Sequence, residues 1–157
     1  MHAQGGDQCE QAEQQSPPFA IDVAALHRQQ YLAGACDTYT TDASGIAYYN
    51  SYLVYFELGR VEMFRELGLP YDRHLPIRDT ACRYHASARF GDLLEVRTTV
   101  QEVRDRGFRL GSRVFRLPQP QGEPELLAEG HTVMVTADDQ GRPVPLPPAF
   151  AEAFVQR

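Results

Sequence analysis

The chain has 157 residues, which suits one domain with a modest core, and its apolar and charged fractions of 43% and 23% are ordinary for a globular protein. The net charge of −6 argues against a general nucleic-acid binder, and no apolar run approaches the roughly 20 residues that span a bilayer. All 15 basic residues are arginine, which excludes Schiff-base and P-loop lysine chemistry and leaves guanidinium as the main group for holding phosphate.

Residues 1–18 are rich in glutamine, glycine and acids and poor in apolar groups, so they are predicted to form a disordered tail before a single domain over residues 19–157. This N-terminus has neither a basic start nor an apolar stretch, so no secretory signal is predicted and the expected location is the cytoplasm. The three cysteines and five histidines are scattered without zinc spacing. We therefore expect no metal and no disulfide framework.

The globular pattern begins near Tyr31, and residues 31–40 are apolar and aromatic enough for a first strand. A turn-rich loop over residues 41–45 precedes a predicted helix over residues 49–67, which Gly68 ends. The helix is predicted because side chains recur at three- and four-residue spacing. These positions are Leu53, Phe56, Arg60, Phe64 and Leu67.

After the helix, the period of the pattern changes from 3.6 to 2. Alternation over residues 82–90, 94–101, 108–117 and 129–137 predicts about four antiparallel strands, followed by a short helix from Ala149. One helix followed by a meander indicates an α+β fold, in which the helix packs on one face of a curled sheet. Such a sheet leaves edges exposed, and pairing edges between two copies would cover them, so a homodimer is predicted.

The candidate chemistry lies in the loop before the helix, since the chain lacks a G-x-S-x-G elbow, an H-E-x-x-H motif, a P-loop and a G-x-G-x-x-G motif. Asp42 places a carboxylate there, and Gly45 allows close approach of the backbone. Unpaired N–H groups at a helix start can stabilise an oxyanion, beside which Asp42 can act as nucleophile or activate water. The alternative is that Asp42 only caps the helix.

The run D-x-x-G-x-x-Y-Y-N-x-Y from Asp42 to Tyr52, with Glu57 and Arg60 on the helix, resembles the 4-hydroxybenzoyl-CoA thioesterase-like branch of the hotdog superfamily. That branch includes the acyl-CoA thioesterases associated with the Tol–Pal cluster. Residues 65–69, 82–96 and 141–147 follow in the family's order, and the likeness extends from about residue 31 to 154. It implies a hotdog fold: an antiparallel sheet of about five strands wrapped around one long central helix. It also implies a homodimer or homotetramer with active sites at the dimer interface.

The same resemblance implies a thioesterase that hydrolyses an aryl or fatty acyl-CoA to free acid and CoA, without metal or organic cofactor. In the implied site, Asp42 is nucleophile or general base, Gly45 is the motif glycine, and the Tyr49 backbone N–H is the oxyanion donor. Tyr49 stands where many relatives have histidine, which leaves the acyl preference open. The remaining residues are assigned to substrate binding, and they are Tyr48, Asn50, Tyr52, Ser87, Arg89, Arg104 and Arg106. The alternatives are that the tyrosines only pack at the helix start and that the hairpin arginines are ordinary solvated side chains.

Residues 101–116 hold five arginines and two acids, a net +3, and the turn around Arg104 and Arg106 resembles the family region that holds the nucleotide of CoA. An acyl carrier protein is an alternative partner, because an acidic carrier would also be attracted to these arginines. A non-catalytic acyl-CoA-binding protein on the same fold is a second alternative. A hotdog dehydratase is disfavoured, since that chemistry uses a histidine near the helix start and this chain has Tyr49 there.

Overall fold

The computed structural model describes residues 28–35, 41–118 and 120–155, with β1 described by its backbone. The predicted tail and the second half of the predicted first strand lie outside these residues. The elements in chain order are β1 (Arg28–Ala35), α1 (Ser51–Leu67), β2 (Ile77–Tyr84), β3 (Leu93–Arg104), β4 (Gly107–Arg116), β5 (Glu125–Val135) and α2 (Pro148–Val155).

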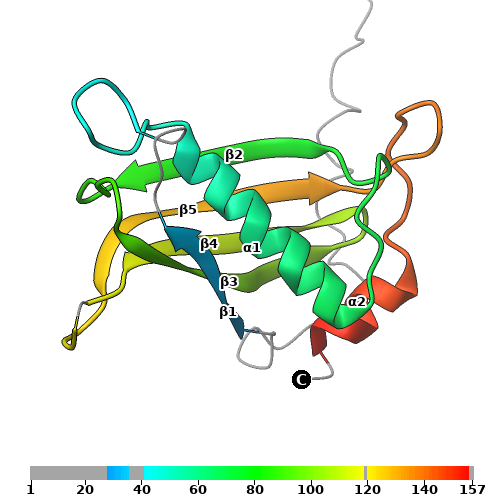
Figure 1. The fold of residues 1–157 in the computed structure, drawn as a ribbon. Coiled ribbons are helices and arrows are strands. Elements are labelled where there is room, and N and C mark those ends of the chain that lie inside the picture. Colours follow the sequence, from blue (N-terminus) through cyan, green and yellow to red (C-terminus); the bar gives the residue numbers. More distant parts are fainter. Residues whose placement is uncertain (1–27, 36–40, 119, 156–157) are drawn as a thin grey trace, which may run out of the picture.

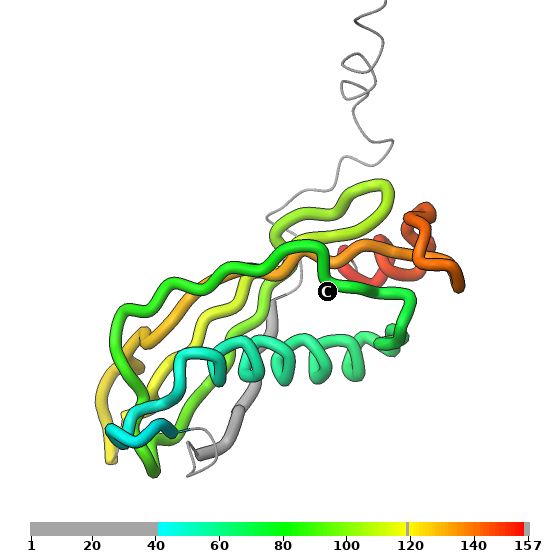
Figure 2. The backbone as a smooth tube through the Cα atoms, turned by 90° about the horizontal axis from the view of Figure 1, so that it is seen from above, coloured from blue at the N-terminus to red at the C-terminus, as the bar shows by residue number. Residues whose placement is uncertain are grey.

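The five strands form one antiparallel sheet in the order β1-β3-β4-β5-β2, so that β1 and β2 are the edges. Helix α1 crosses one face of this sheet (Figure 1). Seen from above, the curved sheet lies along one side of the helix, and α2 lies near one end of the sheet (Figure 2). The α+β arrangement of one long helix on a five-stranded sheet agrees with the sequence prediction.

Helix α1 has the predicted inward face, with Phe56, Met63 and Phe64 buried, and it includes Arg60 at 3% exposure. It ends as predicted at Gly68, which is left-handed at φ 66°, and the next N–H, that of Leu69, reaches back to the Phe64 carbonyl at 2.9 Å. The helix begins at Ser51, two residues later than predicted. The residues before it form a turn that the Ser51 N–H closes onto the Tyr48 carbonyl at 2.8 Å.

The core has two parts, one under each half of α1. Under its C-terminal half, aromatic rings from α1, β4 and α2 pack together: Phe64, Phe108, Phe150 and Phe154. Under its N-terminal half, tyrosine and phenylalanine side chains meet branched residues of the sheet: Tyr52, Tyr55, Phe56, Leu94, Val96, Val114 and Leu127. The second cluster supports the loop that carries Asp42.

Gly59 lets α1 lie close to β3. A Cβ atom on this residue would lie 2.4 Å from the Thr98 Oγ1 and 2.9 Å from a methyl group of Val96. Because real Cβ atoms essentially never make contacts this short, the approach of helix to sheet at this point requires glycine.

The strand predictions hold for β3 and fail for β2. Leu94, Val96, Thr98 and Val100 alternate as buried residues along β3, as expected. The predicted strand over residues 82–90 is wrong in its limits, because β2 begins at Ile77 and ends at Tyr84. As an edge strand, β2 exposes side chains on both faces and so lacks the alternation that identifies a half-buried strand. Among the described residues, no helix is long and apolar enough to cross a membrane.

The other limits differ by a few residues. Strand β1 begins three residues before the predicted start at Tyr31, and β5 begins at Glu125, four residues before the predicted Glu129. Strand β4 and helix α2 each lie one residue earlier than the ranges predicted from Phe108 and Ala149.

Candidate active site

Asp42 begins a tight turn before α1. The Gly45 N–H donates to the Asp42 carbonyl at 3.0 Å, with Gly45 in the left-handed region at φ 78°. The Asp42 carboxylate accepts hydrogen bonds from the hydroxyl of Ser44 and from its backbone N–H, the latter at 2.8 Å. These bonds hold the pKa of Asp42 below its ordinary value of 3.8, and the bond from the Ser44 hydroxyl has the largest effect. The exposed carboxylate is therefore ionised at neutral pH.

Asp42 does not cap the helix. The N-cap residue of α1 is Asn50, eight positions later, and its side chain makes no capping hydrogen bond. The hydrogen bonds to the Asp42 carboxylate come from its own loop, so the capping interpretation is excluded for the described residues.

The peptide groups of Ala88 join the Asp42 loop to the first turn of α1. The Ala88 carbonyl accepts the Ala47 N–H at 2.8 Å, and Ile46 pairs with Arg89 as an isolated β-bridge. The Ala88 N–H donates to the hydroxyl of Tyr52, a helix residue only 2% exposed, at 2.9 Å. The loop, the segment after β2 and the helix start therefore form one connected structure.

Arg116 fixes the segment after β2 from the other side. Its guanidinium donates to the Ser87 carbonyl at 2.6 Å and pairs with Asp92 at 2.9 Å. Because Arg116 belongs to β4, these contacts tie the Ser87–Asp92 stretch to the centre of the sheet.

The residues just before α1 present backbone donors and aromatic rings at the surface. Tyr48 and Tyr49 are 45% and 62% exposed, with ring centroids 4.4 Å apart. Among the described residues, no backbone carbonyl accepts the Tyr49 N–H. An ionised carboxylate and an available amide N–H thus lie in one connected loop and helix start, which is the pair of groups that acyl transfer needs.

Most of the predicted substrate-binding residues gather in this region. Tyr48 and Asn50 are exposed at the helix start, and Ser87 and Arg89 are exposed on the segment that pairs with the Asp42 loop. Tyr52 is instead a core residue whose ring packs against Tyr55 and Tyr84. Its predicted contact with substrate stays a prediction.

Arg104 and Arg106 lie elsewhere. They are at the β3–β4 hairpin, and the Arg104 guanidinium pairs with Glu102 at 2.7 Å. The Asp42 loop lies near the opposite end of β3, and 12 residues at about 3.3 Å each make that strand roughly 35–40 Å long. Within one copy of the chain, the structure does not bring these arginines beside Asp42.

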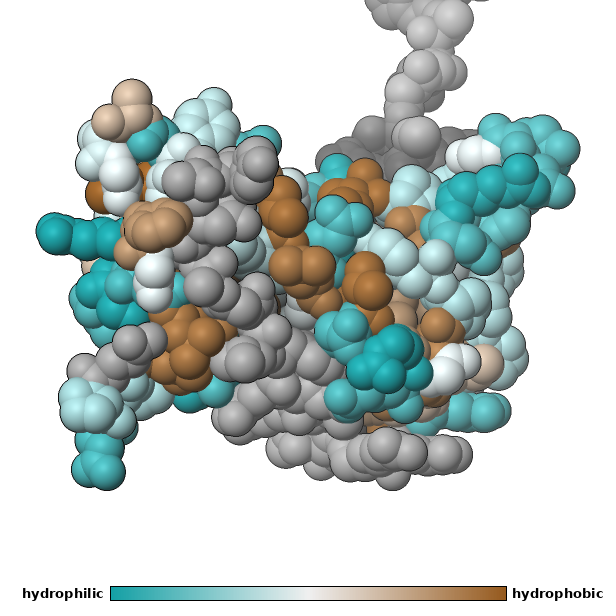
Figure 3. All heavy atoms as spheres, viewed as in Figure 1, coloured by the Kyte–Doolittle hydropathy of each residue, from teal (hydrophilic) through white to brown (hydrophobic). Residues whose placement is uncertain are grey.

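A shallow surface pocket lies between α1 and the edge strand β2, and it was not predicted from the sequence. Its lining residues are Asn50, Leu53, Val54, Glu57, Arg60, Ile77 and Thr80. Apolar side chains gather on the exposed face along α1 (Figure 3), where Val54 and Leu58 are each more than two-fifths exposed. At the pocket's edge, the buried guanidinium of Arg60 donates to the Thr132 hydroxyl at 3.2 Å.

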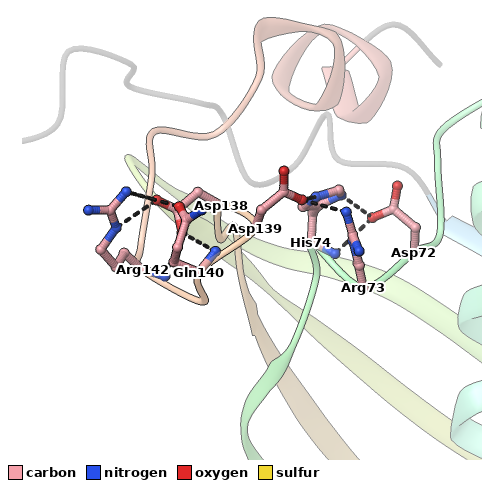
Figure 4. Close-up of polar contacts among 7 residues, drawn as sticks. All are labelled: Asp72, Arg73, His74, Asp138, Asp139, Gln140 and Arg142. Atoms are coloured by element: carbon pink, nitrogen blue, oxygen red, sulfur yellow. Dashed lines mark hydrogen bonds and ion pairs between the residues drawn. The ribbon is translucent and has the colours of Figure 1, made fainter.

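A polar cluster joins two loops beyond the far end of α1 (Figure 4). His74, after α1, contacts Asp72 at 3.1 Å and Asp139, after β5, at 3.0 Å, and Arg73 also pairs with Asp139. The pKa of His74 is raised, mainly by its hydrogen bond to Asp139 and to a smaller extent by the charge of Asp72. Desolvation and the charge of Arg73 act in the opposite direction. Among the residues that the structure describes, no group of three histidine, cysteine or acidic side chains is placed to hold a metal ion.

Comparison with known proteins decides the family. The family model for the thioesterase-like superfamily matches residues 36–154, which contain the Asp42 loop, α1 and the four later strands. The chain belongs to this superfamily. The resemblance inferred from the motif and the assignment as a thioesterase are thereby confirmed.

Individual members of the superfamily agree with this placement. The chain is 31% identical over 123 residues to an acyl-CoA thioester hydrolase, YbgC, of Escherichia coli O6:H1, covering 74% of this chain and 88% of the relative. A 1,4-dihydroxy-2-naphthoyl-CoA thioesterase from Synechocystis superposes with a TM-score of 0.74 at 20% identity, covering 83% of this chain and 97% of that one. The BH1999 gentisyl-coenzyme A thioesterase gives a TM-score of 0.67 at 26% identity, covering 82% and 99%. The hotdog fold is thus confirmed.

Proposed function

We propose that this protein hydrolyses an acyl-CoA thioester, with an aryl acyl group, to the free acid and CoA at the Asp42 loop and the start of α1. The observation that carries the proposal is an exposed, ionised Asp42 carboxylate whose loop is fixed to the helix start through Ala88. The 31% identical acyl-CoA hydrolase and the 26% identical gentisyl-CoA thioesterase support the substrate class.

In the proposed reaction, the thioester carbonyl lies against the Tyr49 N–H, which stabilises the negative charge that develops on the carbonyl oxygen. In one route, an oxygen of Asp42 attacks the carbonyl carbon, the C–S bond breaks, CoA leaves as the thiolate, and water hydrolyses the resulting anhydride. In the other, Asp42 takes a proton from the water that attacks. Both routes give the same acid and thiol, and the low pKa of Asp42 supplies the required carboxylate in each.

The environment of the helix start supports an aryl acyl group. The exposed rings of Tyr48 and Tyr49 offer aromatic faces and edges, which favour offset or edge-on contact with another ring. Asn50, which lines the pocket between α1 and β2, adds an amide next to them. We propose that the acyl group enters this pocket from the helix start.

For the CoA phosphates, Arg89 is the proposed contact within the same copy. It is exposed beside the Asp42 loop, and its guanidinium has no acidic partner among the described residues. Because Arg104 and Arg106 lie toward the other end of β3, their proposed role in holding the nucleotide requires them to come from another copy of the chain.

We also propose a homodimer formed through β2. The edge of this strand is unpaired among the described residues, and the apolar side chains of Ile77 and Val54 beside it are 50% and 49% exposed. Pairing two such edges would continue the sheet across the dimer and cover the pocket next to α1. The predicted cytoplasmic location and the alternative of a carrier-protein substrate stay predictions.

The proposal is tested by measuring free-thiol release from aryl, short-chain and long-chain acyl-CoA thioesters with the unaltered protein and Asp42→Asn. We expect kcat to fall by about 10² or more in the variant, as for loss of a positioned base or nucleophile. Affinity for CoA, measured by calorimetry, should change little. The amide keeps the shape of the side chain, so the fold should be retained.

Asp72→Asn is a matched control. The Asp72 carboxylate accepts the N–H of His74, two residues on, at 2.8 Å, which repeats the contact between Asp42 and Ser44. Asp72 lies beyond the other end of α1, so its variant should keep kcat within about twofold. Equal hydrolysis by the two variants would contradict the role of Asp42, and binding of acyl-CoA without turnover by the unaltered protein would favour a binding module.

A further inference from the structure

Tyr84, the last residue of β2, makes a hydrogen bond to the backbone at the proposed oxyanion site. Its hydroxyl donates to the Tyr49 carbonyl at 3.0 Å. The helix leaves this carbonyl available, because the Leu53 N–H donates instead to Asn50 at 3.1 Å. The turn before α1 is therefore held by a side chain from the sheet in addition to the bond from the Ser51 N–H of the helix to the Tyr48 carbonyl.

The ring of Tyr84 is about half exposed, and one side of it contacts the core. It packs edge-on against Tyr52, with centroids 5.3 Å apart and planes at 72°. Tyr52 is buried, and its hydroxyl accepts the Ala88 N–H that links the Asp42 loop to the helix. One pair of tyrosines thus contacts both the segment that holds Asp42 and the peptide next to the Tyr49 N–H.

The Tyr84 hydroxyl stays a donor over the working pH range of most enzymes. Desolvation, followed by the neighbouring thiol of Cys82, raises the pKa of Tyr84 to about 12. A neutral phenol donates to a carbonyl, whereas a phenolate would repel it. The bond to Tyr49 is consequently insensitive to pH near neutrality.

We propose that Tyr84 is a positioning residue, whose hydroxyl fixes the Tyr49 carbonyl and thereby the backbone of residue 49, so that the Tyr49 N–H in the adjoining peptide is directed at the thioester oxygen in the transition state. The inference rests on the proposed function of the Asp42 site. An oxyanion donor accelerates a reaction to the extent that it is already oriented when charge develops. Asn50 gives this turn no side-chain cap, so the Tyr84 bond adds a restraint from the sheet to the one that the Ser51 N–H supplies from the helix.

Tyr84→Phe tests the proposal, because phenylalanine keeps the ring against Tyr52 and removes only the hydroxyl. We expect kcat for aryl-CoA hydrolysis to fall about tenfold, because the loss of one neutral hydrogen bond raises the activation free energy by an amount that corresponds to about that factor in rate. KM should change by no more than about twofold. Thr136→Val is the matched control. It removes a hydroxyl that likewise donates to a backbone carbonyl, that of Val144 at 2.6 Å, after β5 and away from the helix start, and it should leave kcat unchanged.

A spectroscopic measurement separates orientation from general stability. In the Asp42→Asn background, 4-hydroxybenzoyl-CoA should bind without rapid turnover, and its thioester C=O stretch should shift to lower frequency on binding. Adding Tyr84→Phe should reduce that shift, whereas adding Thr136→Val should not. A purely structural role would lower the melting temperature without changing the carbonyl frequency.

The outcomes distinguish this inference from the proposed function. Asp42-dependent hydrolysis with an unchanged kcat and carbonyl shift in Tyr84→Phe overturns the role of Tyr84 alone. A loss of activity accompanied by a change in sedimentation also overturns it, because the effect then belongs to assembly. Absence of hydrolysis by the unaltered protein overturns the proposed function, and the role of Tyr84 with it.

Discussion

Three of the aspartates in the described part of the chain make the same local contact. The carboxylates of Asp42, Asp72 and Asp138 each accept the N–H of the residue two positions on, at 2.8, 2.8 and 2.9 Å. This turn geometry is a common property of aspartate and carries no chemistry by itself. What distinguishes Asp42 is that its loop is linked through Ala88 to the start of a helix with an available N–H, so the function that we propose for it depends on the neighbours that the fold supplies.

The motif singles out Asp42 in the sequence for the catalytic role that we propose, whereas no sequence pattern singles out Tyr84, the residue that we propose to orient the Tyr49 N–H. The sequence places Tyr84 near the beginning of a predicted strand over residues 82–90, as one of several alternating residues. The structure ends β2 at this residue, and its hydroxyl reaches Tyr49, 35 positions earlier in the chain. A contact between an edge strand and a helix start leaves no periodic trace in the sequence.

His74 gives a pH dependence that belongs to the residue scale. Its pKa is raised in the folded state by Asp139 and Asp72, so its contribution to stability is complete below the unfolded value near 6.5 and is lost as pH rises through the folded value. We expect the melting temperature to fall as the pH rises above about 6.5 and through the raised pKa of His74, and to fall less in His74→Asn and Asp139→Asn. Identical slopes in all three proteins, measured by circular dichroism, would contradict this role.

At the scale of elements, α1 and β3 were predictable because each has one buried face with a clear period. Arg60 occupies a core-facing position of α1, as its spacing required, although it is charged. Strand β2 was misplaced because an edge strand exposed on both faces has no such period. The sequence pattern thus reports burial, and it is silent where an element is not buried.

Helix α1 should not tolerate a side chain at Gly59. Alanine is normally favoured over glycine in a helix by about 1 kcal/mol, but here its Cβ would lie 2.4 Å from the Thr98 Oγ1. We expect Gly59→Ala to lower the free energy of unfolding in urea by about 1–3 kcal/mol, as for other overpacked cores. In a Thr98→Ala background the same change should cost less, and an equal cost in both backgrounds would contradict the contact.

At the scale of the whole molecule, assembly is the least predictable property from one chain. The sequence implied a dimer only through open sheet edges and family resemblance. Arg104 and Arg106 were assigned to the same site as Asp42, yet β3 separates them within one copy. A linear sequence shows which arginines are close together along the chain. It does not show at which end of the sheet they lie, or whether they contact the site of their own copy or that of another copy.

The β2 edge makes the dimer testable. We expect the 17.7 kDa chain to sediment at about twice its mass and Ile77→Arg to shift it toward the monomer, because a charge would be buried at the paired edges. Val155→Arg is the control, since Val155 is similarly exposed at 44% but lies on α2. A monomeric unaltered protein, or equal effects of the two variants, would contradict assembly through β2.

The Ala88 connection has a consequence for how far such a sequence can diverge. Both of its hydrogen bonds use main-chain atoms of residue 88, one the N–H and the other the carbonyl. Peptide groups are the same whatever side chain is attached, so the distance between the Asp42 loop and the helix start does not depend on a particular amino acid at position 88, provided that it is small enough for a fully buried site. Chains that share less than a third of their residues, as this one does with its bacterial relative, can in this way inherit the same geometry.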